Sequence, residues 1–217
     1  MTELFAEYGG AAYTALATVC GTTVGMVGTA KTDDALTEDG CAKIARFVRI
    51  CDAFSIPLIT LIDTIGFAGS TETELTGSVR ALTRLAGSYA EATTAKISVV
   101  TGKAVGAVFT ALAGKGSNAD FAYALEKAYI APLLPEAAVE FLWHDKLKDC
   151  QDLNAKRQEL AKEYTATLAS AESAAKLGIL DEIITPSDMR AVLSSALTML
   201  EGKRVTNFPK KHNNFPF

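Results

Sequence analysis

Two segments of the chain share a pattern in which an apolar strand ends in a glycine turn and a helix follows. The first segment covers residues 57–69, and the second covers residues 96–109. Neither strand alternates between apolar and polar residues, as expected of a strand that is covered on both faces of a parallel sheet. Strands that alternate with helices predict an α/β layered fold with a largely parallel sheet, formed by one domain over residues 1–217.

The segments around this pattern carry their own local signals. Residues 11–19 and 23–30 are β-prone and separated by a short turn with a glycine, so they predict a β-hairpin. Between the two glycine-turn segments, Thr71-x-x-Glu74 matches a capping box. This pattern predicts one long helix from Thr71 to about Thr93.

The ends of the chain and one internal connection look less regular. Residues 1–10 form a lead-in with the breaker Gly9-Gly10, and residues 32–37 form a polar connection. Residues 203–217 carry several basic side chains and two prolines. We expect this segment to be a tail that docks on a neighbouring chain.

Composition limits the partners and the compartment of the protein. The formal net charge is -4, whereas a nucleic-acid-binding domain usually carries a basic stripe, so nucleic acid is not an expected partner. The four cysteines form no Cys-x-x-Cys pair and no secretory leader is recognisable, which favours buried free thiols in a reducing cytoplasm. No apolar run approaches the ~20 residues of a membrane helix, so membrane association is expected only through a partner.

The two glycine turns are the candidate functional elements. Gly66 permits a conformation that exposes the N–H groups of Gly66 and Phe67, and Gly106 does the same for Ala107 and Val108. Free N–H groups near the start of a helix stabilise a developing oxyanion. The turns therefore predict a main-chain oxyanion site, although a glycine between a strand and a helix is also common in turns without function.

Side chains give little support for other chemistry. The two histidines, His144 and His212, lie far apart with no cysteine pair beside them, so no metal site is predicted. The chain lacks the Gly-x-Ser-x-Gly elbow of serine hydrolases, the P-loop and the Gly-x-Gly-x-x-Gly dinucleotide pattern. Asp63 ends the first apolar strand, where it either caps nearby N–H groups or reaches the site.

Several motifs follow one another in the order of a known family. They lie in residues 40–58, 63–67, 89–93, 103–107, 174–184, 186–190 and 210–213. In these motifs the chain resembles the biotin-dependent acyl-CoA carboxyltransferases. This family includes the β subunits of propionyl-CoA carboxylase and the carboxyltransferase subunits of methylmalonyl-CoA and glutaconyl-CoA decarboxylases. The resemblance spans about residues 13–217, and its strength lies in the order of the motifs.

The resemblance implies a crotonase (ClpP-like) superfamily fold of stacked ββα units. It also implies transfer of a carboxyl group between carboxybiotin, which a partner protein carries, and the α carbon of a coenzyme A thioester. Oxyanion holes in such an enzyme hold the thioester enolate and the ureido oxygen of biotin. By this resemblance the catalytic N–H groups belong to Gly66, Phe67, Ala107 and Val108, and the biotin-binding residues are Ile65, Gly69, Gly106, Phe109 and Thr110.

The same resemblance implies partners. A family subunit holds two crotonase-like halves, and this chain resembles only the second half, which serves biotin. An acyl-CoA-binding carboxyltransferase half and a biotin carrier protein are therefore expected partners, within a homo- or hetero-oligomer.

Two other functions stay open on the sequence. In the first, the chain is an inactive structural homologue within such an assembly, because Ala107 and Val108 stand where the family has smaller residues. In the second, it catalyses another crotonase-type reaction on a coenzyme A thioester, which needs a positioned carboxylate. Asp63, Glu72 and Glu74 are the candidates for that carboxylate.

Overall fold

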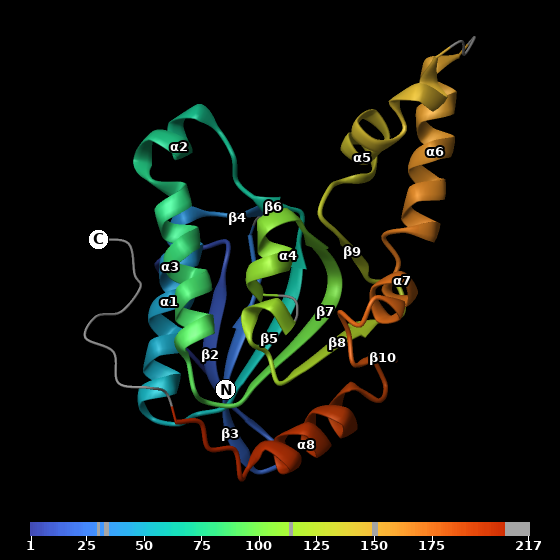
Figure 1. Ribbon diagram of the computed structural model, residues 1–217. Coiled ribbons are helices and arrows are strands. Elements are labelled where there is room, and N and C mark those ends of the chain that lie inside the picture. Colours follow the sequence, from blue (N-terminus) through green and yellow to red (C-terminus); the bar gives the residue numbers. More distant parts are fainter. Residues whose placement is uncertain (30, 33–34, 113–114, 149–151, 207–217) are drawn as a thin grey trace.

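A mixed sheet forms the centre of the computed structural model, which describes residues 1–29, 31–32, 35–112, 115–148 and 152–206 (Figure 1). The strand order is β1-β2-β3-β5-β7-β8-β10, with β9 beside β7, while β4 and β6 form a separate pair. Strands β1 to β3 pair antiparallel, and every other described pair is parallel. The strands are β1 (Thr2–Glu3), β2 (Tyr13–Val19), β3 (Thr22–Gly28), β4 (Ala35–Leu36), β5 (Leu58–Thr64), β6 (Gly66–Phe67), β7 (Lys96–Val105), β8 (Phe121–Leu125), β9 (Tyr129–Ala131) and β10 (Glu182–Ile184).

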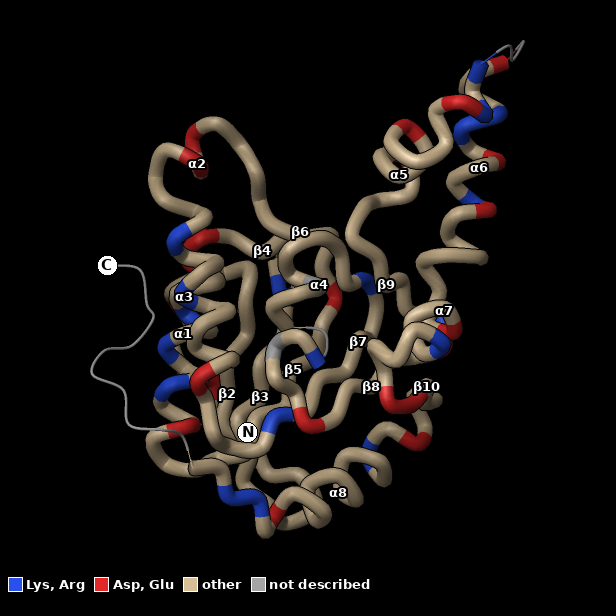
Figure 2. The backbone as a smooth tube through the Cα atoms, in the orientation of Figure 1, with Lys and Arg blue, Asp and Glu red and all other residues tan. Residues whose placement is uncertain are grey.

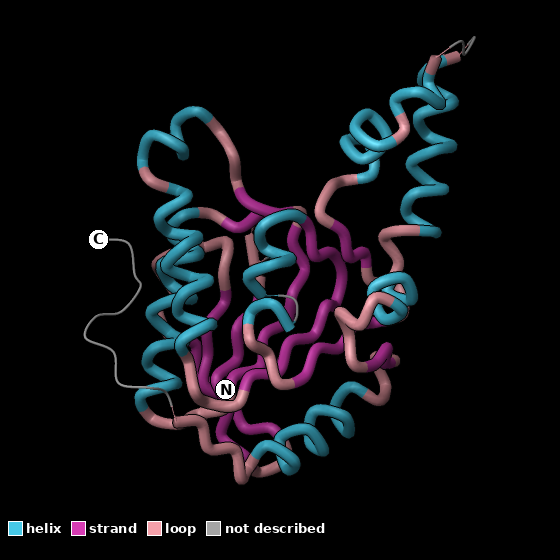
Figure 3. Tube along the Cα trace, viewed as in Figure 1, coloured by secondary structure: helices cyan, strands magenta, loops and turns pink. Residues whose placement is uncertain are grey.

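Helices cover both faces of this sheet, and the charged residues gather on helices and connecting segments (Figure 2). Helices α1, α3, α4 and α7 contribute to one hydrophobic core, and α8 packs on the other face (Figure 3). No described helix has the length and the apolar composition to cross a membrane. The helices are α1 (Glu38–Ala53), α2 (Thr71–Thr76), α3 (Ser78–Glu91), α4 (Gly106–Leu112), α5 (Pro135–Leu142), α6 (Leu153–Thr167), α7 (Ala171–Lys176) and α8 (Met189–Leu200), with short 3-10 turns η1 (Lys115–Ser117) and η2 (His144–Leu147).

Strand β5 shows why the predicted parallel strands lack polar alternation. Leu58 and Ile62 lie in the core that α1 and α3 cover, whereas Ile59 lies in the core under α8. Because successive side chains of a strand point to opposite faces, both sets of positions must be apolar. The α/β layers predicted from this pattern are confirmed.

The predicted hairpin at residues 11–30 is confirmed as β2 and β3. Val19 pairs with Thr22, so Cys20 and Gly21 alone form the turn. Both have positive φ, 49° and 90°, which is the geometry of the two-residue turns that suit the twist of a hairpin. Cys20 is exposed, so the prediction that the cysteines are buried is wrong for this residue, whereas Cys41 and Cys51 are buried. Cys150 lies outside the described residues.

The predicted long helix at residues 71–93 is two helices. Gly77 has a φ of 106° and ends α2, and α3 begins at the next residue. The capping box uses Ser70 and Thr73 rather than Thr71 and Glu74, because the Ser70 hydroxyl accepts the Thr73 N–H at 3.1 Å. The left-handed glycine therefore changes the direction of the chain where helical periodicity alone predicts continuity.

Three segments predicted to lack regular pairing contain ordered contacts. Residues 1–10 include β1, which pairs with β2, and residues 32–37 include β4, which pairs with β6. In the predicted tail, the Lys203 ammonium donates to the Thr94 carbonyl at 3.0 Å and to Asp120 at 2.8 Å, so the tail begins on its own chain. Residues 207–217 lie outside the described part.

Helix α1 offers a matched test of the core. Phe47 is fully buried and Phe54, at the end of the same helix, is 73% exposed. We expect Phe47→Ala to lower the free energy of unfolding by about 3–5 kcal/mol, because it leaves a cavity. Phe54→Ala is expected to change it by less than about 0.5 kcal/mol. Urea denaturation of both variants measures the difference, and equal losses would contradict the packing described here.

Candidate functional site

The two predicted turns lie side by side because β5 and β7 are neighbouring parallel strands. Their register pairs Leu58 with Lys96 and Thr64 with Ala104, with an irregularity between Ile62 and Thr64. A Cβ atom on Gly66 would lie 3.4 Å from the carbonyl oxygen of Val105, the last residue of β7. The first turn therefore contacts the chain directly before Gly106, at the edge formed by the carboxyl ends of the strands.

The backbone of the first turn is held by Thr64 and β4. Gly66 has a φ of 125°, and its N–H donates to the Thr64 hydroxyl at 3.2 Å. This N–H is therefore paired, against the prediction that it is exposed. The Ala68 N–H donates to the Leu36 carbonyl of β4 at 3.0 Å. Because successive N–H groups of a strand point to opposite edges, the Phe67 N–H points away from β4.

The second turn starts α4. Gly106 has a φ of 68°, and a Cβ atom there would lie 3.7 Å from the Pro132 carbonyl oxygen. The first N–H groups of a helix have no acceptor inside the helix, and Ala107 lies in this first turn. Val108 is fully buried in the main core, while Ala107 is exposed. The Val108 side chain thus points into the core and does not crowd the exposed side of the turn, as the inactive-homologue alternative requires.

Some other predicted site residues lie near these turns and one stands apart. Ile65 and Phe67 are half-buried, and Thr110 is exposed on α4. A Cβ atom on Gly69 would have no neighbour within 4 Å, so Gly69 lies in an open part of its loop. Phe109 belongs to α4, but its side chain lies outside the described part of the structure.

A groove of about 660 Å³ runs between α3 and α4 beside the second turn. Ala107 and Thr110 line it, together with small or apolar residues and a single carboxylate. The remaining lining residues are Leu82, Thr83, Ala86, Gly87, Ala90, Glu91, Ala111 and Gly116.

The candidate carboxylates do not converge on the turns. Asp63 accepts a hydrogen bond from the Lys103 N–H at 2.9 Å, and a Cβ atom on Gly102 would collide with its carboxyl group. Asp63 therefore caps backbone, which confirms the first of its two interpretations. Glu72 and Glu74 lie in the first turn of α2, where acids stabilise the helix. Among the described residues no group of three His, Cys, Asp or Glu side chains is placed to hold a metal ion.

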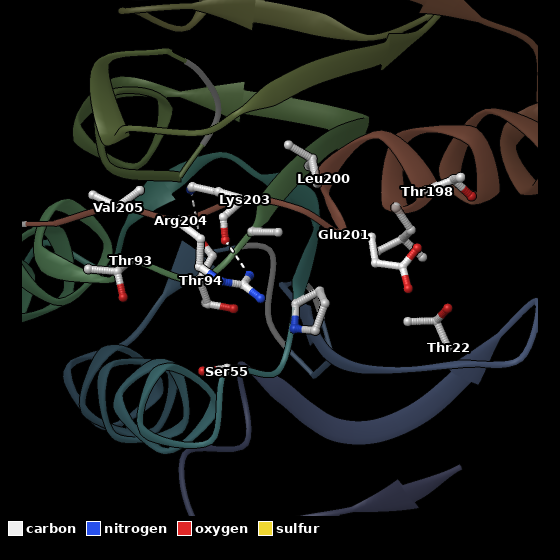
Figure 4. Close-up of a pocket in the computed structure, with 13 residues that line it drawn as sticks. Thr22, Ser55, Thr93, Thr94, Thr198, Leu200, Glu201, Lys203, Arg204 and Val205 are labelled. Carbon is white, nitrogen blue, oxygen red and sulfur yellow. Dashed lines mark hydrogen bonds between the residues drawn. The ribbon is translucent and has the colours of Figure 1, made fainter.

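A second cavity, of about 630 Å³, lies at the opposite edge of the sheet, by the amino ends of β5 and β7 (Figure 4). Threonine and serine hydroxyls line it together with Glu201, Lys203 and Arg204. The Arg204 guanidinium donates to the Lys203 carbonyl at 2.8 Å. None of the predicted site residues lines this cavity, and no sequence motif pointed to it.

Gly106 and Gly69 provide a test of the turn geometry. We expect Gly106→Ala to lower the free energy of unfolding by about 1–2 kcal/mol, because a Cβ atom is strained at this positive φ. Gly69→Ala is expected to stay within about 0.5 kcal/mol of the parent, since no neighbour meets its Cβ atom. Thermal and urea unfolding of both variants check this. A neutral Gly106→Ala would contradict the left-handed turn.

Comparison with known proteins places the chain among carboxyltransferases. The model of the carboxyl transferase domain family matches residues 1–215. The propionyl-CoA carboxylase carboxyltransferase subunit of Haloferax mediterranei is 40% identical over 174 residues, which are 80% of this chain and 34% of that protein. The methylmalonyl-CoA carboxyltransferase 12S subunit of Propionibacterium freudenreichii subsp. shermanii is 36% identical over 216 residues, or 99% of this chain and 41% of that subunit.

Solved structures agree with these relatives. The transcarboxylase 12S structure, described as a hexamer assembly with methylmalonyl-coenzyme A and methylmalonic acid bound, superposes with a TM-score of 0.93 at 36% identity. It covers 99% of this chain and 42% of that chain. The predicted crotonase-like fold is confirmed by this likeness. The chain thus spans between about a third and two fifths of the length of these relatives.

Proposed function

This chain belongs to the carboxyl transferase domain family, and from that premise we propose that it is the biotin-side half of a split acyl-CoA carboxyltransferase. The half moves a carboxyl group between carboxybiotin and the α carbon of an acyl-CoA. The relatives support this proposal through their names, which include a propionyl-CoA carboxylase subunit and a methylmalonyl-CoA carboxyltransferase subunit.

One observation carries the proposal. The turns that match the family motifs lie together at one edge of the sheet, where the Cβ position of Gly66 is 3.4 Å from the Val105 carbonyl. A main-chain site needs such convergence, because each turn offers only one or two N–H groups. The lack of a converging carboxylate among the described residues also suits carboxyl transfer better than hydration, which needs a positioned acid or base.

Biotin, when bound, supplies a ureido nitrogen that carries the carboxyl group and a ureido oxygen on which negative charge develops. The N–H groups of Phe67 and Ala107 are suited to that oxygen, because preorganised donors stabilise a charge that appears only in the transition state. The left-handed glycines Gly66 and Gly106 keep side chains away from both turns. The Asp63 carboxylate is already bound to the Lys103 N–H and does not oppose the oxyanion.

The acyl-CoA-binding half and the biotin carrier are separate proteins in this proposal. The relatives are more than twice as long as this chain, and the 12S structure with bound coenzyme A ester extends beyond the part that matches. A radiolabelled carboxyl group should pass from carboxybiotin to an acyl-CoA when the chain is purified in complex with its partner half. A folded complex that transfers none to any tested acyl-CoA would refute the proposal.

A backbone-donor variant tests the role of the second turn. Ala107→Pro removes one N–H from the first helical turn, where proline is tolerated, so the helix is expected to stay folded. We expect transfer by the complex to slow about 100- to 1000-fold. Ala107→Gly keeps the N–H and serves as the matched control, with nearly parental turnover. If Ala107→Pro is as active as Ala107→Gly, the oxyanion at this position is ruled out.

A further inference from the structure

Helices α5 and α6 form a projecting arm at one side of the molecule (Figure 1). Their shared interior is a small core of its own, with Ala138 and Val139 of α5 packed near Leu160 and Tyr164 of α6. The Glu140 carboxylate of α5 lies 2.6 Å from the Arg157 guanidinium of α6. The arm is therefore held together chiefly by contacts between its own two helices.

The apolar surface of α5 is wider than the part that the arm buries. Leu134, Ala137 and Phe141 follow one another at i, i+3 and i+7, so they lie on one side of the helix. All three are exposed, and Phe141 is 79% exposed. We name these three residues the α5 stripe. A helix whose apolar surface extends beyond its packed face is usually covered by another element.

The rest of the arm has the polar surface of a solvated element. Figure 2 shows residues of both charges spaced along α6. Lys146 pairs with Glu163 at 3.3 Å, and Lys156 pairs with Glu159 at 2.9 Å. The α5 stripe is therefore a bounded apolar patch on an otherwise charged arm.

The root of the arm adjoins the candidate site. The Pro132 carbonyl, three residues before α5, lies 3.7 Å from the Cβ position of Gly106. A partner that covers the α5 stripe is thus held next to the turn that starts α4. The relatives contain a long region that this chain lacks, since the matched part is 34–41% of their length.

We propose that the α5 stripe is the docking surface for the acyl-CoA-binding half of the carboxyltransferase, with Phe141 as its anchor. The inference rests on the proposed function, because that function requires a second half at the Gly106 turn. Aromatic side chains are enriched at the centres of protein interfaces, where they fill apolar hollows in the partner. The arm then holds the partner half beside the biotin-side turn, and the acyl-CoA it carries meets the same edge of the sheet.

Site-specific photo-crosslinking tests this surface on the full chain. A tagged chain with p-benzoylphenylalanine in place of Phe141 is expressed in the native host, and Phe54 provides the control because it is 73% exposed at the far end of α1. We expect position 141, and not position 54, to cross-link to a polypeptide that matches the amino-terminal region of the relatives. A cross-link to a second copy of this chain, equal yields at both positions, or no cross-link overturns the proposal.

Substitutions separate the docking surface from the reaction. Phe141→Glu should lower co-purification of that polypeptide by about tenfold or more, whereas Phe54→Glu should leave it unchanged. Circular dichroism and melting temperature confirm that both variants fold. If the Phe141→Glu complex assembles normally and transfers carboxyl groups, the docking surface is wrong and the proposed function stands. If the parent complex assembles through position 141 but transfers none, the proposed function fails and the docking surface stands.

Discussion

The pairing of β5 with β7 is the constraint on which the rest of the structure depends. Both strands are buried on both faces, and their parallel register brings Thr64 opposite Ala104. Parallel strands end at the same edge of a sheet, so the turns after them are forced together. The helices that follow, α2 with α3 and α4, then pack beside each other on one face. The candidate site exists because the core of the sheet requires this pairing.

A site of this kind uses side chains mainly to hold backbone. The Thr64 hydroxyl binds the N–H and the carbonyl of Gly66, at 3.2 and 3.1 Å. The Asp63 carboxylate occupies the space beside Gly102 and accepts the Lys103 N–H. These groups shape the turns without offering an acid, a base or a nucleophile. The geometry therefore suits a reaction in which stabilising charge is the main demand on the protein.

The sequence predicted the layers well, because an apolar strand without alternation is stable in water only when both of its faces are buried. It failed where a single contact decides the outcome. Periodicity continued through Gly77, whose left-handed conformation divides the helix. The short strand β4 has only two residues and no pattern of its own. The pairing of the Gly66 N–H with Thr64 depends on a φ of 125°, which the residue type permits and does not specify.

The central claim is that biotin binds at the edge where the two turns meet. The most direct measurement is a titration of the ¹⁵N-labelled chain with free biotin, followed through backbone amide resonances. The account predicts saturable shifts at Phe67 and Ala107, with the amides around Thr94 and Arg204 unchanged. Shifts confined to the cavity that Thr94 and Arg204 line, or no shifts in the folded chain, would contradict it.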